Sequence, residues 1–188
     1  MFSKNIYYIV SLLVIALFAS ACSTKKAGSI ADPCSKDPKW YSQEKCPKGY
    51  ICGFGTGGSS NSSTAEFKAK GEARTDLAAN LEIAVSKVMI GGINEMEGAQ
   101  DLEQDVLDTK IRFSVQRVLS NTAIHEKEKS MCDGKNWYWV AVKKDLDGVD
   151  YNTMFKEIAK EAKLPEATQQ YIEEVNDWGS RVERELGY

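Results

Sequence analysis

The clearest pattern along this chain is a short apolar run followed by a long amphipathic stretch. Residues 50–55 are apolar or glycine and predict a β-strand, and the glycine- and serine-rich residues 56–63 predict a loop. Residues 64–88 predict a helix, because small and apolar residues recur every three or four positions, at Ala65, Ala69, Ala73, Leu77, Leu81, Ala84, Val85 and Val88. Alanine lets a helix approach a sheet closely, so we expect this helix to pack on the strand that precedes it.

The following part predicts a second helix and a hairpin. Residues 89–100 contain few periodic apolar positions and predict a turn or a mobile connection. Residues 101–120 carry a broad apolar face that is typical of a helix. Asp133-Gly134 signals a β-hairpin, and the run that follows it, residues 136–143, is apolar on both faces. Such a strand is expected at the centre of its sheet.

The C-terminal part predicts two further helices. An apolar stripe over residues 151–162 forms the first, and Leu164-Pro165 ends it and starts the second. The second helix carries apolar residues every three or four positions as far as Leu186, including Trp178. This face is more often packed on its own domain, but Trp178 is also a candidate for a subunit contact.

These elements together predict an α+β fold. We expect residues 50–145 to form a domain whose elements are, in order, a strand, two helices and a β-hairpin. The strand and the hairpin would form a small three-stranded sheet that packs on the helices. Residues 146–188 form a two-helix C-terminal extension in this reading. The chain is long enough for one such domain and too short for two.

The first 21 residues resemble a bacterial lipoprotein signal peptide. Lys4 supplies a positive start, residues 6–18 form an apolar core too short for a permanent membrane span, and small residues precede Cys22. The Cys22 thiol would accept a lipid group after cleavage, and several acyl chains give stable anchoring. The alternative is an ordinary secretory signal that happens to contain a cysteine.

The residues after Cys22 bear on location. Ser23 rather than aspartate follows Cys22, which implies the outer membrane under the enteric sorting rule. Residues 22–32 are small and polar and predict a flexible tether between the lipid and the domain, which would lie in the periplasm or at the cell surface.

The cysteine count agrees with export. Of five cysteines, Cys22 would carry lipid, which leaves an even number for disulfides in an oxidising compartment: Cys34, Cys46, Cys52 and Cys132. Three pairings are possible, and we favour Cys34 with Cys46 and Cys52 with Cys132. A zinc site is disfavoured, because no C-x-x-C spacing occurs and the chain has a single histidine.

Charge argues against nucleic acid as a partner. The chain has 27 acidic residues and 24 basic ones, of which Lys4 would be lost with the signal. Binding to phosphates requires clustered positive charge, which this mildly negative chain lacks.

Residues 33–49 have no periodic pattern and hold several prolines and lysines. They predict an irregular arm, pinned by a disulfide, with Trp40 as its packing anchor. Trp40 and Tyr41 are also candidates for an exposed binding site, although packing is the more frequent role of such a pair.

The glycines at positions 53, 55 and 58 match the G-x-G-x-x-G pattern of dinucleotide-binding loops. The predicted helix begins several residues after Gly58, however, and the acidic residue at the expected distance, Asp76, lies in mid-helix. We therefore favour a structural role for these glycines, as small residues where a strand and a helix approach each other. No cofactor is expected.

The order of these motifs resembles the Lpp-twenty-type (20 kDa) outer-membrane lipoprotein family, which includes the flagellar lipoprotein FlgP. The motifs occur in the order lipid cysteine, Trp40, the strand at 50–55, a helix with Ala65, Ala69, Ala73, Arg74, Leu77, Asn80 and Leu81, a second helix, and the run Trp137-Tyr138-Trp139-Val140-Ala141-Val142. From the first strand onward, the similarity covers about residues 49–145. The resemblance implies a small α+β domain anchored in the outer membrane, without enzymatic activity and sometimes assembled into rings. It also marks Arg74 as a candidate interface residue. The arm and the C-terminal helices depart from the family pattern.

These observations favour a lipid-anchored cell-envelope protein with a structural or assembly role, possible homo-oligomers or an envelope-protein partner, and no enzymatic activity. The competing hypothesis is a periplasmic lipoprotein that binds a small ligand or peptidoglycan through the loop after the first strand. No catalytic set is indicated by the spacing of acidic residues or of the single histidine, and no metal site is expected.

Overall fold

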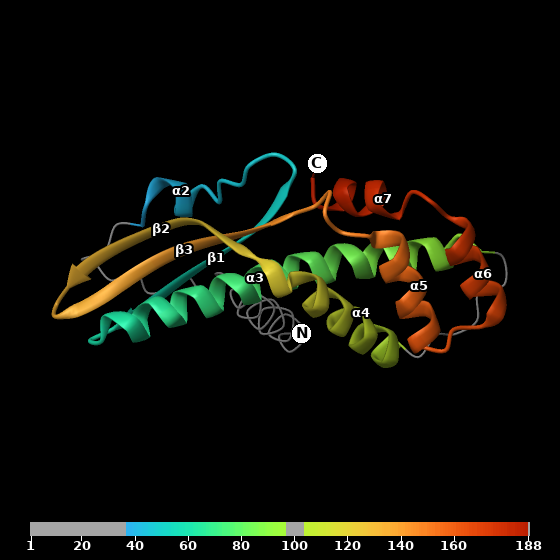
Figure 1. Ribbon diagram of the computed structural model, residues 1–188, viewed down its shortest axis with the longest axis horizontal. Coiled ribbons are helices and arrows are strands. Elements are labelled where there is room, and N and C mark those ends of the chain that lie inside the picture. The colour runs from blue at the N-terminus through green and yellow to red at the C-terminus, as the bar shows by residue number, and fades with distance from the viewer. Residues whose placement is uncertain (1–36, 97–103, 188) are drawn as a thin grey trace, which may run out of the picture. The chain divides into compact units, whose positions relative to one another are not determined.

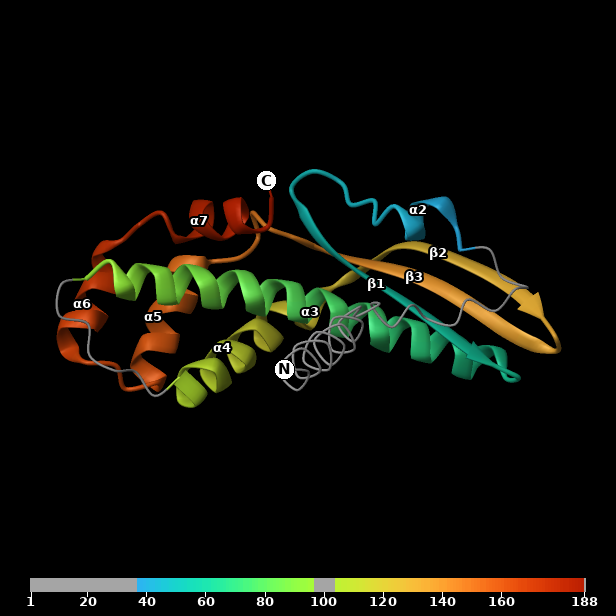
Figure 2. The same ribbon diagram turned by 180° about the vertical axis from the view of Figure 1, so that it is seen from behind.

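The computed structural model describes residues 37–96 and 104–187. The chain divides into two compact units, Met1–Cys34 and Ser35–Tyr188, and the first lies outside the described residues. The second unit has an α+β fold, as the sequence predicts (Figures 1 and 2). Its elements are α2 (Lys39–Ser42), β1 (Tyr50–Ser59), α3 (Ser62–Asn94), α4 (Gln104–Val118), the 3-10 turn η1 (Leu119–Asn121), β2 (Ala123–Cys132), β3 (Lys135–Asp145), α5 (Tyr151–Glu161), α6 (Glu166–Glu174) and α7 (Trp178–Glu185).

The three strands form an antiparallel sheet in the order β1-β3-β2. The central position of β3 confirms the prediction made from its two apolar faces, since five consecutive residues from Tyr138 to Val142 are buried. The hairpin turn lies at Asp133 and Gly134, which both have positive φ angles, of 49° and 72°. A register shift between Ile124 and Glu126 marks a bulge in β2.

Helix α3 packs on one face of this sheet at very short range. Each of Gly53, Gly55 and Gly57 lies opposite backbone atoms of α3, so that a Cβ atom added at any of them would collide with the helix. The helix presents Ala65, Ala69 and Ala73 to the sheet, and all three are fully buried. Glycine on the strand and alanine on the helix are therefore two halves of one close contact.

The prediction of a loop at residues 56–63 is wrong for most of these residues. β1 continues to Ser59, and α3 begins at Ser62 with Asn61 as its N-cap, where Asn61 Oδ1 accepts a hydrogen bond from Thr64 N at 3.1 Å. Residues 56–59 are strand because they pair with β3, and Gly57 fits there because the α3 backbone leaves no room for a Cβ atom. The same contact fills the space that a dinucleotide phosphate would need beside these glycines, which removes the support for that alternative.

Helix α3 also extends beyond the predicted end at Val88, through Gly91 and Gly92 to Asn94. The predicted turn at residues 89–100 is therefore wrong as far as Asn94. Gly92 is retained within the helix because the Trp178 ring lies against it, less than 3.0 Å from where a Cβ would stand. Helix α4 confirms the second predicted helix over residues 104–118.

The C-terminal extension contains three helices instead of two. The residues after α6 leave the helical conformation at Val175, with ψ at 124°, and α7 starts anew at Trp178. Trp178 is 0% exposed, stacks on Phe155 with 4.6 Å between ring centroids and donates from Nε1 to Ile172 O at 3.1 Å. Trp178 is thus a core residue, and the prediction that it could form a subunit contact is wrong. Within the described residues, no helix is long and apolar enough to cross a membrane.

Candidate functional site

The arm that precedes β1 lies on the face of the sheet that α3 leaves free. Trp139 Nε1, on the central strand, donates to Asp37 Oδ1 at 3.0 Å, and Trp40 Nε1 donates to Glu128 Oε2 at 3.3 Å. The Trp40 and Tyr41 rings meet edge to face, 5.8 Å apart. Both side chains are half-buried, so they work as packing residues and still present part of their rings to solvent.

Tyr41 lies in an acidic environment. Its ring contacts that of Phe54 edge to face at 6.3 Å. Burial raises the pKa of the Tyr41 hydroxyl to about 12, and the rise is increased by the negative charges of Glu72, Asp37, Asp76 and Glu44. The hydroxyl therefore stays protonated near neutral pH and can donate a hydrogen bond, but it is not a nucleophile.

Two of these carboxylates close the outer edge of β1. Asp76 Oδ2 accepts from Phe54 N at 2.9 Å, and Glu72 Oε2 accepts from Thr56 N at 2.9 Å. These N–H groups face away from β3 and would otherwise be available to a further strand. The one-turn spacing of Glu72 and Asp76 along α3 matches the two-residue spacing of the donors, so the helix protects this edge of the sheet.

The Cys46–Cys52 disulfide borders a groove of about 420 Å³ between β1, α3 and α7. Asp76 and Asn80 line it from α3, and Lys87 and Glu185 close its far end with a 3.5 Å ion pair. The groove mixes both charge signs with apolar walls, an arrangement that can hold a small polar ligand or a partner side chain.

This disulfide corrects the favoured cysteine pairing, since Cys46 is bonded to Cys52 rather than to Cys34. Cys52 also cannot reach Cys132, because Cys52 lies opposite Lys143 of β3 whereas Cys132 lies opposite Lys135, eight residues away along the same strand. Eight residues of strand span about 27 Å, whereas the Cα atoms of a disulfide lie within about 7 Å. Cys132 is nevertheless disulfide-bonded. Cys22 and Cys34 lie outside the described residues.

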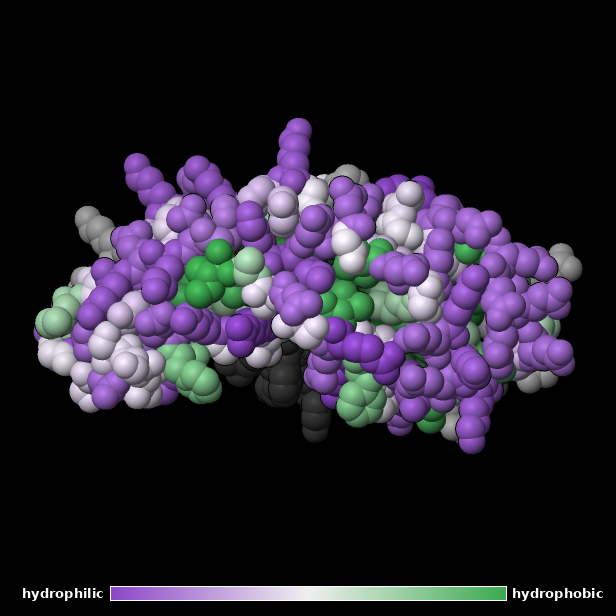
Figure 3. Space-filling view, in the orientation of Figure 1, coloured by the Kyte–Doolittle hydropathy of each residue, from purple (hydrophilic) through white to green (hydrophobic). Residues whose placement is uncertain are grey.

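Arg74 lies on the outer face of α3, away from the arm and its aromatic side chains. It is exposed and borders a hollow of about 450 Å³ between α3 and α4, where Arg112 Nε lies 3.7 Å from Glu82 Oε2. Nearby helix faces expose large apolar side chains, with Phe67 78% and Phe113 56% exposed. Hydrophobic side chains interrupt the otherwise hydrophilic surface in separate groups (Figure 3).

A polar cluster ties the start of α3 to the hairpin. Ser62 Oγ lies 2.9 Å from the Tyr138 hydroxyl and accepts from Lys129 Nζ at 3.1 Å. Serine, lysine and tyrosine can form a nucleophile and its base. All three side chains are used in hydrogen bonds that join α3 to the hairpin, and Lys129 is exposed, so we interpret the cluster as a structural contact.

The sequence reasoning passed over a second acidic region. An acidic segment, Asp145-Leu146-Asp147-Gly148-Val149-Asp150-Tyr151-Asn152, joins β3 to α5 and lines part of a hollow of about 280 Å³. Three aspartates and an asparagine within eight residues, directly before a helix, are the sequence signal that could have identified it. Among the described residues, no three histidine, cysteine or carboxylate side chains converge closely enough to hold a metal ion.

Three comparisons with known proteins leave the chain unassigned to a family. No family model matches it, and no curated protein or solved structure shows significant similarity to it.

Proposed function

We propose that this protein is a lipoprotein of the cell envelope, held in the outer membrane by acyl chains on Cys22. The folded domain would act as a tethered structural or assembly module rather than as an enzyme. The observation that carries the proposal is the state of the cysteines. Every described cysteine, at positions 46, 52 and 132, is disulfide-bonded, which is typical of proteins that fold in an oxidising compartment. The signal-like pattern that ends at Cys22 independently supports export.

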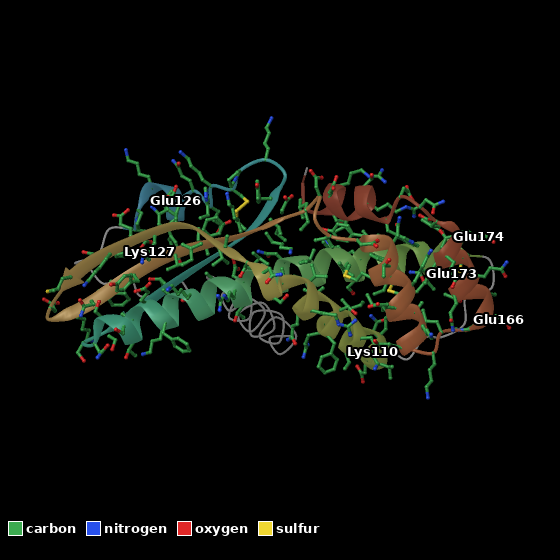
Figure 4. All side chains as sticks on the ribbon, in the orientation of Figure 1. Lys110, Glu126, Lys127, Glu166, Glu173 and Glu174 are labelled. Carbon is green, nitrogen blue, oxygen red and sulfur yellow. A yellow bond between two sulfur atoms is a disulfide. The ribbon has the colours of Figure 1, made fainter. Side chains whose placement is uncertain are left out.

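The outer edge of β2, which pairs with no other strand among the described residues, is the surface that we assign to partner binding. β2 is an edge strand, and its residues Glu126 to Lys129 are all exposed. Lys127 reaches Glu66 on α3 at 3.1 Å, whereas Glu128 bonds Trp40 on the arm (Figure 4 labels Glu126 and Lys127). Lysines therefore lie on one side of the strand and glutamates on the other. A partner strand that pairs here needs the complementary arrangement of charges.

The same alternation disfavours pairing of β2 with β2 of a second copy. In an antiparallel pair with two-fold symmetry, residues of one face meet residues of the same face. Glutamates would therefore oppose glutamates, and lysines would oppose lysines. The β1 edge is already occupied by Glu72 and Asp76. Pairing at the β2 edge is thus expected with a different protein, or with a segment other than β2 in a second copy of this chain.

Lipidation is tested by growing cells with labelled palmitate and fractionating their membranes. The parent protein should incorporate label and sediment with the outer membrane, whereas Cys22→Ala should do neither. An unlabelled parent protein, or a Cys22→Ala variant that fractionates like the parent, would refute the anchor.

Partner binding is tested with photo-crosslinking residues placed at Glu126 on the β2 edge and, as a control, at Glu173 on the exposed side of α6 (Figure 4). Position 126 should give a discrete crosslinked species in native envelopes, and position 173 should not. Equal crosslinking at both positions, or none at 126 together with a monodisperse monomer on sedimentation, would count against the assembly role.

A small-ligand binder remains the second candidate, and the groove beside the Cys46–Cys52 disulfide is the observation that favours it. It differs from the loop first suggested by the sequence, because that loop is strand. Saturable binding of a small envelope metabolite that Asn80→Leu abolishes would support this second function.

A further inference from the structure

The disulfide partner of Cys132 is narrowed by elimination. Cys132 ends β2 and is disulfide-bonded. Cys46 and Cys52 are bonded to each other, so neither is available to it. The chain has five cysteines, which leaves Cys22 and Cys34 as the partners within the chain. The position of Cys132 on the sheet and the chemistry of Cys22 distinguish between these two.

The face of the sheet is the first constraint. Cys132 lies opposite Lys135 of β3, and Glu128 lies opposite Trp139. Opposed residues of an antiparallel pair, and residues two apart along a strand, project from the same face of a sheet. Trp139 and Glu128 are the residues that bond the arm. Cys132 therefore projects from the face on which the arm lies, and it is buried there.

The length of chain before the arm is the second constraint. Asp37 Oδ1 accepts from Trp139 Nε1 at 3.0 Å, which fixes the first described residue of the arm beside the pair of Trp139 and Glu128. Cys132 lies four residues farther along β2, at a distance of about 13 Å. Cys34 precedes Asp37 by three residues, which extend over about 10 Å, and a disulfide adds about 6 Å between Cα atoms. Cys34 is thus within reach of Cys132.

Chemistry separates Cys34 from Cys22. The chain before Asp37 is long enough for Cys22 to reach the same place, but a sulfur atom that carries a lipid thioether cannot also form a disulfide. On this point the inference rests on the proposed lipid anchor. We propose that Cys34 and Cys132 form a disulfide that fastens the N-terminal end of the arm to β2. The two thiols lose two protons and two electrons, and the disulfide form of an exported thiol oxidoreductase accepts them and becomes a dithiol.

The two disulfides would hold the arm at both outer strands of the sheet. Cys46 is bonded to Cys52 of β1, Trp139 of the central strand bonds the arm between them, and Cys132 belongs to β2. The arm would thus be a strap across all three strands. A pull on the lipid anchor would reach the sheet through covalent bonds, and not only through the hydrogen bonds of the arm.

The experiment is peptide mapping of the full-length protein purified from envelopes, with free thiols blocked by N-ethylmaleimide and no reductant. Trypsin cleaves after lysine, so that each cysteine falls in a separate peptide, namely 22–25, 27–36, 46–48, 49–68 and 130–135. The expected result is a linked pair of peptides 27–36 and 130–135, from a protein that runs as a monomer on a non-reducing gel.

Thiol counting in denaturant tests the same bond without requiring the variants to fold. Cys34→Ser should leave Cys132 as a free thiol that N-ethylmaleimide modifies. The matched control, Cys46→Ser, should free Cys52 and leave Cys132 unmodified. Modification of Cys132 in the parent protein, or its absence in Cys34→Ser, would overturn the proposal.

The map separates failure of this bond from failure of the lipid anchor. A link between peptides 22–25 and 130–135 would overturn both, because the Cys22 sulfur would then carry no lipid. A free thiol in peptide 27–36, or a disulfide-linked dimer in which Cys132 bonds a second copy, would overturn the Cys34–Cys132 bond alone. Palmitate labelling tests the anchor separately in those cases.

Discussion

Replacement of Gly55 by alanine should destabilise this domain, whereas the same substitution at Gly71 should not. A Cβ atom at Gly55 would stand within 3.0 Å of Ala73 N, Ala73 Cα and Ala69 O, which are all backbone atoms of α3. No side-chain rotation relieves such a contact, so the strand and the helix must move apart. Gly55 is not among the glycines with a positive φ, so the effect is one of space and not of backbone conformation.

The magnitude follows from the cost of overpacking. Extra methylene groups in well-packed cores cost about 1–3 kcal/mol, and a rigid helix backbone places Gly55→Ala at the upper end, at about 3 kcal/mol. This is a large share of the roughly 5–15 kcal/mol that stabilises a typical domain. Gly71 is exposed on the same helix with nothing within 4 Å of an added Cβ. Gly71→Ala should therefore stabilise the protein, by about 0.5–1 kcal/mol.

The assay is equilibrium urea unfolding with intact disulfides, followed by tryptophan fluorescence, which the buried Trp139 and Trp178 provide. With a typical urea dependence of about 2 kcal/mol per molar, Gly55→Ala should lower the midpoint by about 1.5 M, and Gly71→Ala should raise it slightly. A Gly55→Ala protein with the parent's midpoint and slope would refute the close packing of β1 on α3.

Three other predictions concern the region around β1. The Cys46–Cys52 disulfide restricts the unfolded chain, so replacing both cysteines by serine should cost about 2 kcal/mol and lower the melting temperature. Equal stability of this variant and the oxidised parent would contradict the prediction. Asp76→Ala should cost about 1–3 kcal/mol and speed hydrogen exchange at the Phe54 amide, because its acceptor is lost, whereas Asp76→Asn keeps an acceptor and should recover most of the stability; similar losses in both variants would point to another cause. Because the folded-state pKa of Tyr41 is raised from 10.0 to about 12, the folded protein holds this proton more tightly than the unfolded chain. Its contribution to stability is complete below pH 10 and is lost as the pH rises toward 12, so the pH dependence of unfolding should be shallower in Tyr41→Phe, and identical profiles would exclude this role.

Local patterns in the sequence identified the elements whose buried faces are regular. The eight positions from Ala65 to Val88 that predicted the inner face of the helix are all buried. The Asp133-Gly134 turn and the central place of β3 were also predicted, because positive φ angles and two apolar faces each leave a direct mark on residue choice.

The errors have a common origin in contacts between distant segments. Gly57 looked like part of a loop, but it is a strand residue that lies under the α3 backbone. Gly92 belongs to the segment predicted as a turn, but it lies within α3 and makes room for Trp178, which is distant from it in the chain. Trp178 itself looked like a possible surface residue because its stripe was read as one continuous helix.

The sequence by itself determined which faces are apolar and where the hairpin turns. Only the tertiary structure decided that Cys46 pairs with Cys52 and which carboxylates cover the β1 edge. The physical reason is that periodicity records how each residue meets water along its own element. Pairing and pockets instead depend on distances between elements, which no local pattern encodes.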